Sequence, residues 1–142
     1  MDNYFSIKIF NLALTMNTNP VNLAVRFLLE IAMLIALGLW GWDLTETWIR
    51  YITAVGLPLI AVVLWGIFRI PNDPKPAPVA ISGVLRLILE LGLFALATWA
   101  LYQLRYSNLA LLMGVIVVLH YVISYDRTWA MLRNRPYKGF VK

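Results

Sequence analysis

The stretch RFLLEIAMLIALGLW at positions 26–40 has a counterpart sixty residues later, RLILELGLFALATWA at positions 86–100. Each stretch opens with an arginine and places a glutamate four residues later, and neither contains another charged residue. A spacing of four puts both side chains on one face of a helix. We therefore expect an internal repeat in which each copy carries one charged pair on an otherwise apolar helix.

The composition predicts a membrane protein. Hydrophobic residues make up 61% of the 142 residues and charged residues only 13%, and the mean hydropathy is +0.75. Soluble domains have about 25% charged residues. The chain has no cysteine, which excludes disulfides and thiolate metal sites. The expected fold class is all-α, an integral membrane four-helix bundle.

Four apolar stretches are each long enough to cross a membrane, which takes roughly 20 helical residues. The predicted spans are 21–42, 48–68, 79–104 and 107–125. Paired two by two, they form two tandem helical hairpins, whose pseudo-twofold axis runs along the membrane normal. A second echo, VVLWGIF from Val62 and VVLHYVI from Val117, supports this pairing and aligns Trp65 with His120. The expected parts of the chain are an interfacial or flexible N-terminal extension (1–19), a membrane domain (20–127) and a basic cytoplasmic tail (128–142).

The basic residues predict that both termini are cytoplasmic, because Lys and Arg concentrate on the cytoplasmic side of membrane proteins. In that orientation ten basic residues lie inside: Lys8, Arg26, Arg69, Lys75, Arg86, Arg127, Arg133, Arg135, Lys138 and Lys142. Two, Arg50 and Arg105, lie outside. The lipid bilayer accounts for the net charge of +5, so no nucleic-acid partner is expected. The sequence leaves open whether translation starts at Met1 or at Met16.

The charged pairs are the candidate site. At ~1.5 Å per residue, Arg26 lies roughly 9 Å and Glu30 roughly 15 Å beyond the helix start, inside the bilayer. Because an arginine that precedes a glutamate is the poorer order within a helix, we expect pairing across the repeats, Arg26 with Glu90 and Arg86 with Glu30. His120 is expected at the same depth. Possible supporting residues are Asn22, Ser82, Tyr121 and Ser124.

Catalytic motifs are missing from the sequence. It contains no HExxH, no GxSxG and no phosphate-binding loop. Asp126 and Arg127, at the end of the last span, are interpreted as a local cap or an interfacial pair. The sequence therefore predicts a protein that is not an enzyme and has no cofactor and no metal site.

The stretches NPVNLAVRFLLEIAMLIALGLWGW, AVVLWGIFRIPNDP, GVLRLILELGLFALA and VVLHYVISYDR together resemble the YrdB family of small bacterial membrane proteins. The resemblance runs from about Asn19 to Arg127. It implies a bacterial cytoplasmic (inner) membrane protein with four spans. The family is one of unknown function, so the resemblance carries over no activity and no functional residues.

Two functions remain open. Intramembrane ionisable groups are typical of transport and proton pathways, so the protein is either a small carrier or channel for a polar solute, ions or protons, or an accessory subunit of a larger membrane complex. In the second case the charged pairs only fix how the helices pack. The presence of two charged pairs slightly favours the carrier, because a single pair would be enough to fix the register of the helices. Homo-oligomers or larger complexes are possible partners in both cases.

Overall fold

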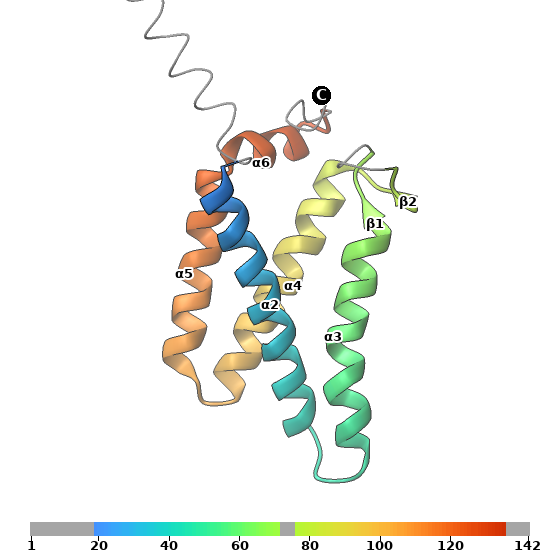
Figure 1. Ribbon diagram of the computed structural model, residues 1–142, viewed down its shortest axis with the longest axis vertical. Coiled ribbons are helices and arrows are strands. Elements are labelled where there is room, and N and C mark those ends of the chain that lie inside the picture. The colour runs from blue at the N-terminus through green and yellow to red at the C-terminus, as the bar shows by residue number, and fades with distance from the viewer. Residues whose placement is uncertain (1–18, 72–75, 136–142) are drawn as a thin grey trace, which may run out of the picture.

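The computed structural model describes residues 19–71 and 76–135, and this part of the chain is mainly helical (Figure 1). Its helices are α2 (Pro20–Asp43), α3 (Ile49–Ile67), α4 (Gly83–Gln103), α5 (Ser107–Ile123) and α6 (Tyr125–Leu132). Two short strands, β1 (Phe68–Arg69) and β2 (Val79–Ala80), lie between α3 and α4. The expectations for the N-terminal extension, for the choice of start codon and for the end of the basic tail fall outside the described residues.

The long helices run side by side, with their short turns at one end of the molecule (Figure 1). The α2–α3 and α4–α5 turns lie at this end, and the two strands and α6 lie at the other. Helix α2 contacts α3, α4 and α5, and α4 contacts α5 and α6. The charged motifs, on α2 and α4, are therefore carried by two helices that pack against each other.

Both motif-bearing helices begin at a residue that caps them. The side chain of Asn19 accepts a hydrogen bond from the backbone N–H of Val21 at 2.9 Å, and Pro20 takes the first helical position. The hydroxyl of Ser82 accepts from the N–H of Leu85 at 3.3 Å. Ser82, named above as a possible supporting residue of the site, is thus the cap of α4.

The helix predicted from position 79 begins four residues later, at Gly83. The first two skipped residues form β2, which pairs in parallel with β1, Phe68 opposite Val79 and Arg69 opposite Ala80. The N–H of Ile81 also donates to the carbonyl of Arg69 at 3.0 Å. The β-branched Val79 and the nearby prolines favour this extended backbone over a helix. The expectation of an all-α chain therefore misses one small sheet.

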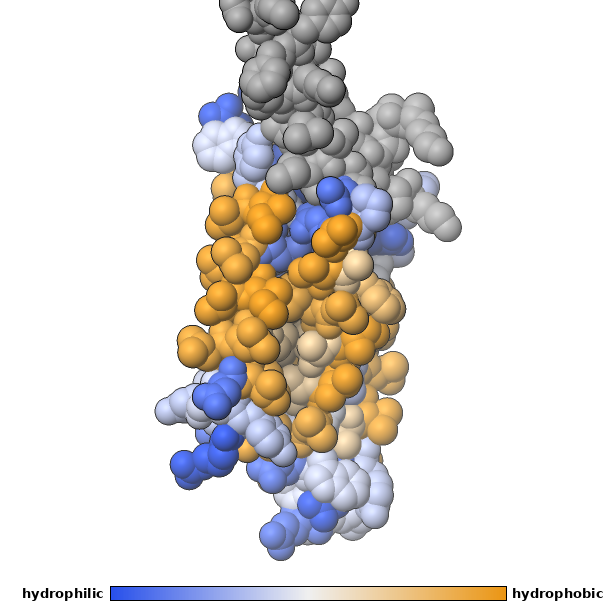
Figure 2. All heavy atoms as spheres, turned by 60° about the vertical axis from the view of Figure 1, so that its left-hand side comes forward, coloured by the Kyte–Doolittle hydropathy of each residue, from blue (hydrophilic) through white to orange (hydrophobic). Residues whose placement is uncertain are grey.

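Three of the described helices, α2, α3 and α4, are long and apolar enough to cross a membrane. Helix α5 has 17 residues and meets the same test only together with α6, from which it is bent by 78°. The fourth predicted span, 107–125, thus corresponds to α5 and ends at the first residue of α6. Figure 2 shows a broad band of hydrophobic side chains between two hydrophilic ends. These apolar helices are those of a membrane protein.

Two glycines let segments approach closely. A Cβ added at Gly41 on α2 would fall 2.6 Å from the backbone carbon of Thr53 on α3, whose hydroxyl donates to the Gly41 carbonyl at 2.5 Å. At Gly83 an added Cβ would fall 2.7 Å from the Cα of Met131 on α6. The start of α4 and the end of α6 are thus in backbone contact.

Candidate functional site

One carboxylate, that of Glu90, lies at the centre of a cluster of donors. Its residue is fully buried, with 0% of its surface exposed. Oε1 accepts from Nε of Arg86 at 2.7 Å and from Nη2 of Arg127 at 2.8 Å. Oε2 accepts from Nη1 of Arg127 at 2.9 Å and from the hydroxyl of Tyr121 at 2.7 Å. A carboxylate has about four acceptor positions, and here four donors use them.

Arg86 links this carboxylate to the end of α3. While its Nε donates to Glu90 one turn further along α4, its Nη1 donates to the carbonyl of Trp65 at 2.7 Å and to that of Phe68. The last carbonyls of a helix have no partner within it and carry partial negative charge. A guanidinium at this position therefore caps α3 and also neutralises Glu90.

Arg127 reaches Glu90 from α6 and was not among the predicted site residues. The sharp bend after α5 and the close contact between Gly83 and Met131 bring α6 against the start of α4. The guanidinium of Arg127, which is 3% exposed, then holds both oxygens of Glu90. Such bidentate pairs are among the stronger hydrogen-bonded contacts in proteins. This contact with Glu90 was not part of the interpretation of Asp126 and Arg127 as a local cap or an interfacial pair.

The first motif is more open than the second. Arg26 donates through Nε to Glu30 at 3.1 Å, and their side chains are 20% and 28% exposed. Nη2 of Arg26 lies 3.8 Å from Oε1 of Glu90, so one of the two expected pairings across the repeats is present. The other is not, because Arg86 pairs with Glu90 on its own helix. In place of the two expected cross-pairs, three arginines surround one carboxylate.

Trp65 lies beside both motif arginines, a position that the sequence analysis did not assign to it. The guanidinium of Arg86 is 4.7 Å from the centre of its ring and that of Arg26 is 5.8 Å away. The ring also meets Phe94 edge to face, with centroids 5.8 Å apart. Aromatic faces attract cations, so Trp65 stabilises the cluster from α3. The alignment of Trp65 with His120 was the one feature of the sequence that linked Trp65 to the candidate site.

His120 belongs to a second, smaller network. Its Nδ1 is 2.9 Å from Oδ1 of Asn22, and Nδ2 of Asn22 donates to the hydroxyl of Ser124 at 2.7 Å. These residues, all predicted as site residues, join the start of α2 to the end of α5. The next residue, Tyr121, points its hydroxyl at Glu90 and connects α5 to the main cluster. The structure therefore brings together every predicted site residue except Ser82.

The arrangement is suited to neutralising charge and holding helices in place. Arg26, Arg86 and Arg127 carry three positive charges, and Glu30 and Glu90 carry two negative ones. Because Glu90 is buried and its acceptor positions are used, it cannot act as an accessible base without losing partners. Within residues 19–71 and 76–135, no group of three or more histidines and carboxylates could hold a metal ion.

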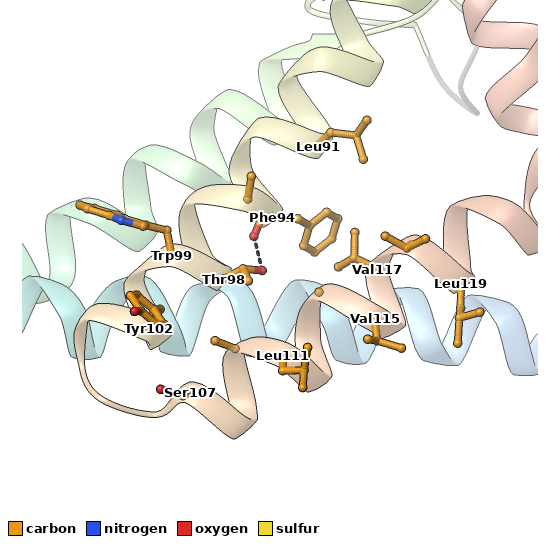
Figure 3. A pocket seen from close by; sticks show the side chains of 14 residues that line it. Leu91, Phe94, Thr98, Trp99, Tyr102, Ser107, Leu111, Val115, Val117 and Leu119 are labelled. Carbon is orange, nitrogen blue, oxygen red and sulfur yellow. Dashed lines mark hydrogen bonds between the residues drawn. The ribbon is translucent and has the colours of Figure 1, made fainter.

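A hollow of about 990 Å³ lies between α4 and α5 and is separate from the charged cluster. Figure 3 shows leucine, valine and aromatic side chains along it. The hydroxyl of Thr98 donates to the Phe94 carbonyl of its own helix at 2.8 Å. None of the five charged cluster residues lines this hollow, so it offers apolar contact and no charge.

Comparison with known proteins places the chain in a family. The family model described as a protein of unknown function (DUF2568) matches residues 24–118. "Uncharacterized protein YrdB" of Bacillus subtilis (strain 168) is 37% identical over 112 residues, which cover 77% of this chain and 91% of that protein. No solved structure matches. The matched family range contains both charged motifs and ends before Tyr121 and Arg127.

Proposed function

The chain belongs to the DUF2568 family, as its resemblance to YrdB predicted, and on this premise we propose that it is a non-catalytic accessory or structural subunit of a larger membrane complex. It would span the bacterial cytoplasmic membrane four times, with both termini in the cytoplasm. The observation that carries the proposal is the state of Glu90, which is fully buried and bonded by four donors.

A transport site needs groups that exchange partners and reach water. A structural ion cluster needs groups that keep fixed partners and are shielded from water. The donors on Glu90 come from α4, α5 and α6, and Arg86 extends the network to α3. Arg26, at 3.8 Å from Glu90, adds α2. One carboxylate thus joins all five described helices, which favours a role in fixing their positions.

The surface of α3 supports a docking role. Ala61 is the one residue of this helix that is buried, and Val55 and Leu59 are 65% and 59% exposed. Helix α3 packs mainly on α2 and leaves most of its side chains exposed, so it has an apolar face that can meet lipid or another membrane subunit. We propose that this face contacts the partner subunit.

The proposed topology is a four-helix bundle of two hairpins related by a pseudo-twofold axis along the membrane normal. Contact between α2 and α4, with α3 beside α2 and α5 beside α4, supports this arrangement. Its orientation rests on the charge asymmetry. Glu46→Cys and Ser107→Cys should react with an impermeant thiol reagent in intact cells, and Arg135→Cys should not. The reverse labelling pattern would exclude the proposed orientation.

The function is tested by purification from the native membrane in mild detergent. We expect other membrane subunits to be present in a fixed ratio to the chain, and Leu59→Trp on α3 to remove them. Leu111→Trp on α5, where the side chain is 71% exposed, is the matched control and should keep them. A chain that is isolated alone, or a complex that both variants lose equally, would contradict the proposal.

A carrier is the second candidate, and the partial exposure of Arg26 and Glu30 favours it. With 20% and 28% of their surface exposed, both side chains retain contact with the surroundings of the protein. His120→Gln keeps hydrogen bonding but cannot titrate. In vesicles that contain the pure protein, a carrier should show pH-dependent solute uptake that this variant abolishes. The accessory role predicts no uptake by either form.

A further inference from the structure

Two hollows follow one another along the seam between α2 and α5. The first, about 320 Å³, lies at the start of α2 and the end of α5, where Asn22 and His120 line it. The second, about 510 Å³, runs toward the turn end of the molecule, as far as Leu39 and Tyr106. Val25 and Ile116 line both hollows. Together they form a groove with a polar end and an apolar remainder.

The polar end presents a hydrogen-bond acceptor. The Asn22 amide donates through Nδ2 to Ser124, so its Oδ1 faces Nδ1 of His120. An amide oxygen can only accept, and Nδ1 therefore carries the proton of the neutral ring. Nε2 is then an acceptor, and Asn22 is the one hydrogen-bond partner of the ring among the described residues. The ring also lines the hollow.

The other residues that line the groove indicate the charge and polarity of a ligand that would fit it. No Asp, Glu, Lys or Arg lines either hollow, and Asn19 is the only other amide at the polar end. Val21, Leu119 and Ile123, all exposed, form apolar edges of the first hollow. A charged head would have no counter-charge on these walls, which favours an uncharged head.

The groove is as long as a lipid chain requires. From Asn22 to Leu39, at ~1.5 Å per residue, it follows α2 for roughly 25 Å, most of a hydrocarbon core about 30 Å thick. Its polar end is at the same end of the molecule as α6, near the edge of the apolar band (Figures 1 and 2). A lipid head would lie there and its chain along the seam.

We propose that the α2–α5 groove binds one neutral membrane lipid whose head carries a hydroxyl group, of the diacylglycerol type. The hydroxyl donates to Nε2 of His120, and a hydrocarbon chain occupies the second hollow. This site is separate from the Glu90 cluster and from the α3 face, so it stands whether or not the accessory role is correct.

His120 is the only histidine in the chain, which allows a direct test. The full chain, labelled with ¹⁵N-histidine and purified with a histidine-free tag, is placed in phosphatidylcholine nanodiscs. Dioleoylglycerol should move the Nε2 resonance in a saturable manner, as expected of an acceptor that gains a hydrogen bond, and leave Nδ1 nearly unchanged. Phosphatidylglycerol at the same mole fraction should have no such effect.

Ala32→Phe fills the second hollow, and Ala24→Phe is the matched control, because Ala24 is exposed on the same helix and lines neither hollow. Ala32→Phe should weaken the response to dioleoylglycerol at least tenfold, and Ala24→Phe should not. Absence of a shift with dioleoylglycerol, an equal shift with phosphatidylglycerol, or an equal response of both variants would each overturn the proposal.

Discussion

In the first charged motif the side chains of Arg26 and Glu30 are 20% and 28% exposed, whereas in the second those of Arg86 and Glu90 are 2% and 1% exposed. Both are arginine–glutamate pairs one turn apart on an apolar helix. The second pair differs because α6 packs over it and adds Arg127. Identical spacing therefore gives a partly exposed pair in the first motif and a buried cluster around the second.

The difference has an energetic meaning. An ion pair that stays partly in water contributes little to stability, because solvent screens it and already solvates both charges. A buried pair costs desolvation energy, and removal of one partner leaves the other charge without compensation. The two motifs should therefore respond very differently to the same substitution.

Glu90→Gln should cause the largest loss. It leaves Arg86 and Arg127 buried without their counter-charge, and the free energy of unfolding should fall by ~3–5 kcal/mol. Denaturant titration in mixed detergent micelles measures this loss. The double variant Glu90→Gln with Arg127→Met should recover part of it, and Glu90→Gln with Arg133→Met, which changes an exposed arginine, should not. Equal stability of the two double variants would contradict the Glu90–Arg127 pairing.

Tyr121→Phe should have the next largest effect. The change removes one hydrogen bond to a buried carboxylate, and such bonds contribute about 1.5–3 kcal/mol. Tyr125→Phe is the control, since its side chain is 53% exposed, and it should change unfolding by less than ~0.5 kcal/mol. A similar response of both tyrosines would show that the hydroxyl of Tyr121 adds nothing to the cluster.

Gly83→Ala tests the contact that holds α6 in place. The added methyl group meets the backbone of Met131, so α6 must shift, at a cost of about 1–3 kcal/mol. Gly92→Ala on the same helix meets nothing within 4 Å and should be neutral or stabilising by up to ~1 kcal/mol. Thermal unfolding of both variants in one detergent provides the comparison. If Gly83→Ala lowers the unfolding temperature no more than Gly92→Ala does, α6 does not pack as closely against α4 as described.

Glu30→Gln should have the smallest effect. The first motif is partly exposed, and Arg26 retains Glu90 at 3.8 Å after the change, so unfolding should move by ~0–1 kcal/mol. The same micelle titration as for Glu90→Gln makes the comparison direct. A loss of stability as large as that of Glu90→Gln would mean that both motifs are equally buried and would contradict the difference between them.

Much of the fold could be predicted from the sequence because it depends on local signals. Apolar length located α2, α3 and α4, and Asn19 and Pro20 marked the start of α2 within one residue. The start of α4 was missed by four residues, because pairing of Val79 with Phe68 is a contact between segments that periodicity does not report. The end of α5 at Ile123 lies two residues before the predicted end of the last span, and the helix α6 that follows was not predicted.

The candidate site could be predicted only in part. Four charged residues within apolar helices are easily recognised in the sequence. His120, Asn22 and Ser124, which were also predicted, lie together. The pairing of the arginines and glutamates was not predicted correctly. The preference against an arginine that precedes a glutamate in a helix is worth only tenths of a kcal/mol. Burial outweighs such a preference. Arg127 sits beyond a 78° bend, and nothing in its neighbours along the chain reveals that the bend returns it to Glu90.

The contact between Arg127 on α6 and Glu90 on α4 can form only late in the synthesis of the chain. Glu90 precedes Arg127 by 37 residues, so the ribosome delivers the carboxylate to the membrane before its bidentate partner has been made. Until then Arg86, already one turn away, is the neighbour that lets α4 enter the bilayer with its charge balanced. Only a complete α6 supplies the last donors. A chain cut short before residue 127 would therefore be left with an unfinished centre, which a quality-control protease could distinguish from the finished protein.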